Sequence, residues 1–159
     1  MLHDDRVRAG SFGDDAAQYD RTRPTYPAAL IDDLVAGGPA RVLDVGAGTG
    51  IVSRLLLARG CEVLAIDPDE RMAELARASG VVVEPGTFEE WSPDGRVFDL
   101  VVAGQSWHWV HPDRGSAKAR SVSALRPSTS IGASSRVSEP CPFSMLHIFA
   151  PMRMEASTT

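Results

Sequence analysis

The stretch Val42-Leu43-Asp44-Val45-Gly46-Ala47-Gly48-Thr49-Gly50 decides the fold. Its apolar, β-branched start is typical of a buried parallel strand, and its three alternate glycines predict a tight loop. Residues 51–59 carry apolar side chains at helical spacing, and Gly60 ends that helix. Glycine allows a ligand to approach the backbone, and a helix start presents free N–H groups. The stretch therefore predicts a small-molecule cradle between a strand and a helix; the alternative is a tight turn without a ligand.

Strands and helices alternate on both sides of this loop. The expected elements are a helix over 28–35, a strand over 41–45, a helix over 51–59, a strand over 61–67, a helix over 69–79, and strands over 81–84 and 98–103. A weaker helix over 115–125 follows, and 145–149 is a candidate strand. This alternation predicts an α/β fold with an open parallel sheet and right-handed crossovers.

Two carboxylates beside the loop indicate which ligand it binds. A dinucleotide fingerprint has a third glycine five positions after the first, where this chain has Ile51. Asp44 would repel a pyrophosphate but suits a ligand that carries an ammonium group. Asp67 ends the next strand and is placed to accept from ribose hydroxyls, unless it is only a helix cap or a solvated turn residue. The pattern favours an amino-acid-bearing nucleoside over the nicotinamide cofactor of an oxidoreductase.

Composition restricts the class of protein further. The chain has 159 residues, 43% of them hydrophobic, which indicates one soluble domain. A net charge of −5 leaves no basic footprint for nucleic acid, and no apolar run is long enough for a membrane span or a signal peptide. We therefore expect a cytoplasmic protein. Cys61 and Cys141 are expected to be reduced thiols, and no metal is expected because His108 and His111 lack further ligands at a suitable spacing.

Taken in order, the motifs resemble those of class I S-adenosylmethionine-dependent methyltransferases, within the branch of the type 11 methyltransferase domain and the trans-aconitate-methyltransferase-like enzymes. The resemblance covers roughly residues 12–127. It is carried by Tyr19-x3-Arg23-Pro24-x-Tyr26-Pro27, Val42–Gly50, Ile66-Asp67-Pro68, Gly86-Thr87-Phe88-Glu89, Phe98–Val102 and Gln105–Val110. It implies an open Rossmann-like parallel sheet with flanking helices, S-adenosyl-L-methionine as cofactor and a small-molecule methyl acceptor.

The resemblance implies roles for residues of the glycine loop and the N-terminal segment. Asp44 and the backbone of the loop would hold the methionine part of the cofactor. The loop positions concerned are Gly46, Ala47, Gly48 and Gly50. Tyr19 and Arg23 match an N-terminal segment that closes over the cofactor.

Further positions would bind the nucleoside part. Asp67 would bind the ribose hydroxyls, and Pro68 would pack near adenine. Thr87 stands where relatives often have an aspartate that accepts from the adenine amino group, and Glu89 is an alternative acceptor. The backbone N–H of Phe88 would meet the ring.

The fourth strand leads to the residues implied in methyl transfer. Gln105 follows that strand, where such enzymes line the donor and acceptor pockets. His108 is the candidate general base for an acceptor that must lose a proton; the alternative is a histidine packed between two tryptophans. The aromatic set Trp91, Trp107 and Trp109 would form pocket walls or plain core packing.

The resemblance ends after Pro127, where Ser128–Ser135 is unlike a buried strand. We expect a flexible arm over 1–18, a partial methyltransferase domain over 19–127 and a poorly ordered Ser/Pro-rich tail over 128–159. Truncation after the fourth strand would leave that strand as a sheet edge. The function is then either methyl transfer or that of a non-catalytic cofactor-binding remnant or interaction module.

Overall fold

The protein is described by a computed structural model over residues 26–38, 40–124 and 146–149. Helices and strands alternate along the chain. They are α3 (Ala28–Leu34), β1 (Arg41–Val45), α4 (Ile51–Leu57), β2 (Glu62–Asp67), α5 (Glu70–Ala78), β3 (Val82–Pro85), β4 (Leu100–Gly104), η3 (Trp107–Trp109), α6 (Pro112–Val122) and β5 (Leu146–Phe149). The expected arm over 1–18, with Tyr19 and Arg23, lies outside the described residues, as does Cys141.

The strands form one sheet in the order β3-β2-β1-β4-β5, and its first four strands are parallel. Val42 of β1 lies opposite Val63 of β2 on one side and opposite Leu100 of β4 on the other. The strand order therefore reverses between β1 and β4, which is where open α/β sheets bind ligands. The predicted open parallel sheet is confirmed.

The expectation that the fourth strand would be a sheet edge is wrong. β5 pairs antiparallel with β4, with Ile148 opposite Val102. It lies within the segment expected to be a poorly ordered tail and corresponds to the candidate strand over 145–149; residues 128–145 and 150–159 lie outside the described residues. A free strand edge presents unpaired N–H and C=O groups, and a short apolar segment is enough to pair with them.

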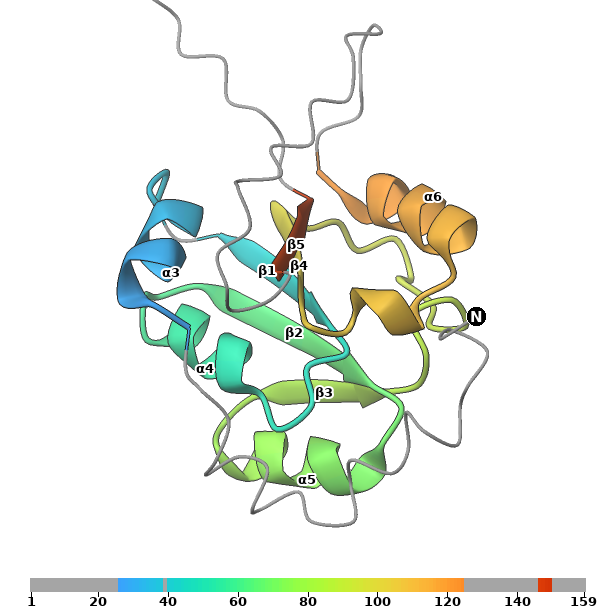
Figure 1. Ribbon diagram of the computed structural model, residues 1–159, viewed down its shortest axis with the longest axis horizontal. Coiled ribbons are helices and arrows are strands. Elements are labelled where there is room, and N and C mark those ends of the chain that lie inside the picture. The colour runs from blue at the N-terminus through green and yellow to red at the C-terminus, as the bar shows by residue number, and fades with distance from the viewer. Residues whose placement is uncertain (1–25, 39, 125–145, 150–159) are drawn as a thin grey trace, which may run out of the picture.

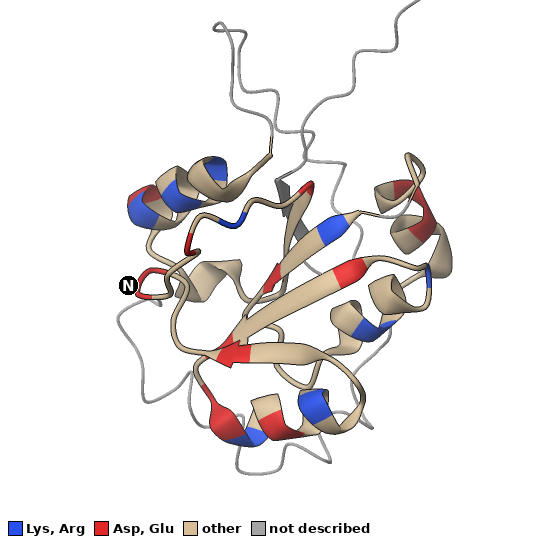
Figure 2. Cartoon of the chain, turned by 180° about the vertical axis from the view of Figure 1, so that it is seen from behind, with Lys and Arg blue, Asp and Glu red and all other residues tan. Residues whose placement is uncertain are grey.

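Both faces of the sheet are covered. One face buries Val42, Val63 and Leu100 against α3 and α4, and α5 packs on the same face over β2 and β3. The opposite face buries Leu43 and Val101 against α6 and the segment that follows β3. Figure 1 shows α3 and α4 on one side of the sheet and α6 on the other. Charge is concentrated on the helices, where acidic and basic residues alternate along α5, and α6 is mostly basic, while the strands are mostly uncharged (Figure 2).

Capping residues set the helix starts. Asp69 caps α5 as predicted, because its side chain accepts from the N–H of Arg71 at 3.0 Å. Helix α6 begins at Pro112, three residues earlier than expected, since proline suits a first helical position and the His111 side chain accepts from the N–H of Arg114.

Among the described residues, no helix has both the length and the apolar character needed to cross a membrane.

Candidate functional site

The glycine loop between β1 and α4 has the left-handed backbone that its sequence predicts. The φ angles of Gly46, Gly48 and Gly50 are +66°, +58° and +82°. A Cβ at Gly46 would lie 2.5 Å from the Cβ of Ser106, whereas a Cβ at Gly48 would meet nothing within 4 Å. Gly46 is therefore required by packing, and Gly48 leaves open space beside the loop that a ligand can occupy.

Asp44 is a buried carboxylate with one unused oxygen. The residue is 1% exposed, and its Oδ2 accepts from the Ser53 hydroxyl at 2.7 Å. Its Oδ1 is buried and has no hydrogen-bond partner among the described residues. Burial raises the pKa of Asp44 to about 6, and the charge of Asp67 acts in the same direction while Ser53 opposes it. A buried acceptor without a donor is costly, so this oxygen favours a ligand that brings a cationic donor.

Asp67 joins the end of β2 to the glycine loop. Its Oδ2 accepts from the N–H of Gly48 at 2.7 Å, and its Oδ1 accepts from the N–H of Asp69 at 2.8 Å. Burial raises the pKa of Asp67, while the two backbone hydrogen bonds lower it. The side chain thus serves the local backbone, and each oxygen keeps a second lone pair for a ligand hydroxyl. Pro68 beside it is exposed.

A pocket opens where β1 and β4 end. It is lined by Tyr26, Asp44, Gly46, Ala47, Gly48, Thr49, Ile51, Val52 and Gly104. Four of these residues are predicted from the sequence: Asp44, Gly46, Ala47 and Gly48. The other five are not: Tyr26, Thr49, Ile51, Val52 and Gly104. Tyr26 lies in the motif before α3. A Cβ at Gly104 would lie 2.7 Å from the Tyr26 hydroxyl. The glycine at the end of β4 is therefore the one sequence signal that could have indicated the position of Tyr26.

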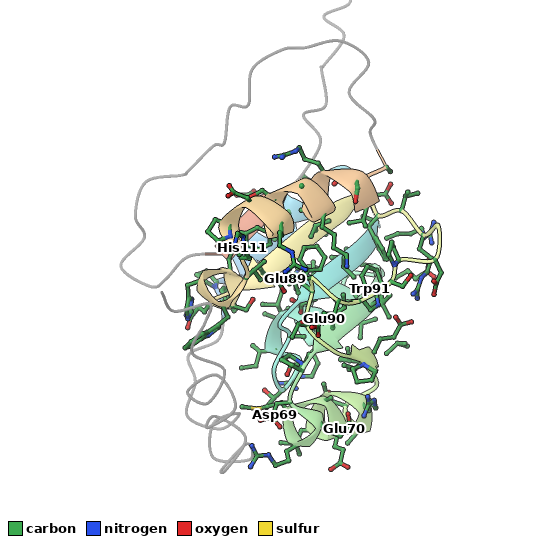
Figure 3. All side chains as sticks on the ribbon, turned by 90° about the vertical axis from the view of Figure 1, so that its right-hand side faces the viewer. Asp69, Glu70, Glu89, Glu90, Trp91 and His111 are labelled. Atoms are coloured by element: carbon green, nitrogen blue, oxygen red, sulfur yellow. The ribbon has the colours of Figure 1, made fainter. Side chains whose placement is uncertain are left out.

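The loop after β3 carries the residues expected at adenine. Thr87 donates from its hydroxyl to Glu90 at 3.0 Å. Glu89, the alternative acceptor for the adenine amino group, accepts from the N–H of His111 at 2.7 Å and so faces α6. Phe88 buries its side chain in the core, and its N–H has no acceptor among the residues that the structure describes. Figure 3 shows Glu89 next to His111 at the start of α6.

The residues expected in methyl transfer lie after β4. Gln105 is half-buried with a φ of +59°, and Ser106 donates from its hydroxyl to the carbonyl oxygen of Val45. His108 is exposed, and its ring lies 4.7 Å from that of Trp109. Neither Gln105 nor His108 is among the residues that line the pocket.

The tryptophans do not form one pocket wall. Trp91 is buried in the core, where its ring lies 6.3 Å from that of Phe98 at a tilt of 48°, and it donates from its indole to Glu84. Trp107 packs on the same cluster, with its ring 6.2 Å from that of Phe88. Core packing therefore accounts for both, as the alternative interpretation expected. Within the described ranges, no group of three His, Cys, Asp or Glu side chains could hold a metal ion.

Comparison with known proteins identifies relatives of this chain. Residues 42–128 match the methyltransferase domain family. An uncharacterized methyltransferase of Mycobacterium tuberculosis is 41% identical over 124 residues, which are 77% of this chain and 50% of that protein. The trans-aconitate 2-methyltransferase of Mycolicibacterium gilvum is 38% identical over 97 residues, 58% of this chain and 37% of that protein. The chain thus spans half the length or less of these curated relatives.

Solved structures share the fold. The complex of DhpI with SAH superposes with a TM-score of 0.60 at 30% identity, covering 73% of this chain and 62% of that one. The complex of DhpI with SAM and HEP gives a TM-score of 0.59 at 30% identity, over 75% and 61% of the two chains.

Proposed function

Because the chain belongs to the methyltransferase domain family, we propose that it binds S-adenosyl-L-methionine and transfers the methyl group to a small-molecule acceptor. The single observation that carries the proposal is the buried, unpartnered Oδ1 of Asp44 in a side chain that lines the pocket. An α-ammonium group would supply the donor that this oxygen lacks. The DhpI complexes with SAH and with SAM, at 30% identity to this chain, support the assignment.

The glycine loop fits the methionine part of the cofactor. Open space beside Gly48 admits a ligand against the backbone, Gly46 and Gly50 give the loop its left-handed turns, and Ala47 lines the pocket. The start of α4 adds its positive dipole end, which suits a carboxylate. Tyr19 and Arg23 are proposed contacts from the segment that precedes the described residues.

The ends of β2 and β3 fit the nucleoside. We assign the ribose hydroxyls to Asp67, whose oxygens keep acceptor capacity beyond their two backbone hydrogen bonds. We assign adenine to the loop after β3, with Pro68 beside the ring, Thr87 near the amino group and the N–H of Phe88 as a donor. Glu89 is not used here, since its carboxylate already binds α6.

Methyl transfer requires little chemistry from the protein. S-adenosylmethionine carries its methyl group on a positively charged sulfur, so the donor supplies its own activation. The chain must hold the reactants in line and exclude water. We assign Gln105, which follows β4, to the acceptor side, and His108 is a general base only for an acceptor that must lose a proton.

Calorimetry and a methyl-transfer assay together test the proposal. We expect S-adenosylhomocysteine to bind wild-type protein and Asp44→Ala to abolish the binding, while Asp33→Ala, an exposed carboxylate on α3, leaves it unchanged. Absence of binding to the wild type would overturn the proposal. Binding without methyl transfer to any small molecule would instead identify the non-catalytic, cofactor-binding alternative.

A further inference from the structure

A single lysine attaches the loop after β3 to α6. Lys118, the only lysine in the sequence, donates from its Nζ to the carbonyl oxygen of Glu89 at 3.1 Å and to that of Trp91. The same Nζ lies 5.5 Å from the ring centre of Phe88 and 5.7 Å from that of Trp91. The cation therefore contacts both the backbone and the aromatic side chains of one short segment.

Two further hydrogen bonds hold the segment at its ends. The Glu89 carboxylate accepts from the N–H of His111 at the start of α6, at 2.7 Å. The N–H of Gly86 donates to the carbonyl oxygen of Asp67 at 3.1 Å, which ties the beginning of the loop to β2. The loop is thus attached to α6 on one side and to the proposed ribose-binding strand on the other; the side of α6 is visible in Figure 3, where Glu89 lies beside His111.

We propose that Lys118 and Glu89 are positioning residues that hold the Phe88 N–H for recognition of the adenine base. The inference rests on the proposed function, because it needs an adenine nucleoside at this loop. A fixed N–H discriminates between purines: N1 of adenine is an acceptor, whereas N1 of hypoxanthine carries a proton and would face the donor. A loop released from α6 would lose this discrimination, since its N–H could move away from the ring.

The lysine is suited to this role by its surroundings. It is half-buried, and burial lowers its pKa while the charge of Glu89 opposes that effect. Its hydrogen bonds to carbonyl oxygens satisfy a cation that has lost part of its hydration, and they are stronger than bonds between neutral groups. Methionine at this position would keep the long apolar stem but could donate to neither carbonyl.

Binding to two ligands separates positioning from plain structural support. S-adenosylhomocysteine and its inosine analogue are titrated into wild type, Lys118→Met, Glu89→Ala and the control Arg120→Met, which removes an exposed cation from the same helix. We expect the wild type to prefer the adenine ligand by about tenfold, the difference of one hydrogen bond to a fixed donor. Both loop variants should reduce that preference to threefold or less, and Arg120→Met should retain it.

The outcomes are distinguishable. Equal loss of affinity for both ligands in Lys118→Met, with the preference retained, would make the lysine merely structural and overturn the inference. So would a wild type that binds both ligands equally well. Failure of the wild type to bind S-adenosylhomocysteine would overturn the proposed function itself.

Because Lys118 is the sole lysine in the sequence, its chemical reactivity can be measured in the wild-type protein as a second test. Acylation of amines by an N-hydroxysuccinimide ester, followed by mass spectrometry, reports on Lys118 and the α-amino group alone. We expect saturating S-adenosylhomocysteine to slow acylation of Lys118 at least threefold without changing that of the α-amino group, because ligand and lysine stabilise the same loop position. An unchanged rate at Lys118 would contradict the coupling, even if the Lys118→Met protein did not fold.

Discussion

The carboxylate of Asp67 and the N–H of Gly48 form a 2.7 Å hydrogen bond that joins β2 to the glycine loop. The other oxygen of the same carboxylate binds the N–H of Asp69 at the start of α5. One side chain therefore fixes the loop on one side of the site and a helix start on the other. Any ligand hydroxyl that reaches Asp67 binds a group whose orientation is already set.

Replacing Asp67 by asparagine should weaken binding of S-adenosylhomocysteine by about 10- to 100-fold, because charge-assisted hydrogen bonds contribute about 1.5–3 kcal/mol. Calorimetry measures the change. The matched control is Asp99→Asn, which alters a carboxylate that accepts from the N–H of Arg41 at 2.8 Å, at the other end of the sheet. Affinity equal to that of the wild type in Asp67→Asn would mean that the ribose contact lies elsewhere.

The stability of the ligand-free protein should decrease as the pH rises from about 4 to about 6. The folded state holds the Asp44 proton with a pKa of about 6, against the ordinary aspartate value of 3.8, so folding binds protons in this interval. The raised pKa of Asp44 corresponds to about 3 kcal/mol of unfolding free energy. This contribution is lost once the pH exceeds the folded-state pKa of about 6. Urea unfolding of wild type and Asp44→Asn across this range measures it, and the difference between the two curves isolates Asp44. Parallel curves would contradict the raised pKa.

Ligand affinity should depend on pH in the opposite sense. An ammonium group binds the ionised form of Asp44, and with a pKa of about 6 only about one tenth of the carboxylate is ionised at pH 5. Calorimetric titrations with S-adenosylhomocysteine should therefore give a Kd about tenfold larger at pH 5 than at pH 7.5. Asp44→Asn should bind weakly at both pH values. Equal wild-type affinities would show that Asp44 does not meet a cation.

Substitutions at Gly46 and Gly48 separate the cost of a left-handed backbone from the cost of a packing clash. Alanine at either position adopts a left-handed backbone at a cost of about 1–2 kcal/mol, but only at Gly46 does its Cβ also collide with Ser106. We expect Gly46→Ala to lose about 2–4 kcal/mol of unfolding free energy and Gly48→Ala about 1–2 kcal/mol. Gly48→Ala should lose ligand affinity more than stability. The same stability loss in both variants would contradict the packing around Gly46.

Tyr26 and Gly104 should be energetically coupled. A Cβ at Gly104 would lie 2.7 Å from the Tyr26 hydroxyl oxygen and 2.9 Å from Val52. We expect Gly104→Ala to destabilise the protein by about 1–3 kcal/mol, and by about 1 kcal/mol less in a Tyr26→Phe background, where the hydroxyl is absent. A double-mutant cycle in urea measures the coupling. Additive effects would mean that the phenol does not lie over the end of β4.

Local patterns were sufficient to predict β1 to β4 and the helices α3 to α5. The short apolar runs of the buried strands and the helical stripe around Ile31 are properties of short segments, as is the cap at Asp69. The glycine loop and Asp44 were predictable for the same reason, since a strand, a turn and a helix start are contiguous in the chain.

Contacts between distant segments could not be predicted. The pairing of β5 with β4 joins residues more than forty positions apart, and no local pattern around Leu146 specifies a partner. The place of Tyr26 in the pocket depends on its packing over Gly104. Glu89 is an alternative adenine acceptor by its sequence position, and its contact with the N–H of His111, 22 positions away, is one that no local pattern predicts.

Strand β1 is paired along both edges and covered on both faces, and its Val42 and Leu43 are 0% exposed. Its amide hydrogens can exchange with solvent only when most of the sheet opens. Asp44 is therefore mounted on the segment that opens last, while β3 at the edge can fray without displacing the carboxylate. The buried carboxylate of Asp44, which we assign to the ligand, therefore lies where local fluctuations disturb the structure least.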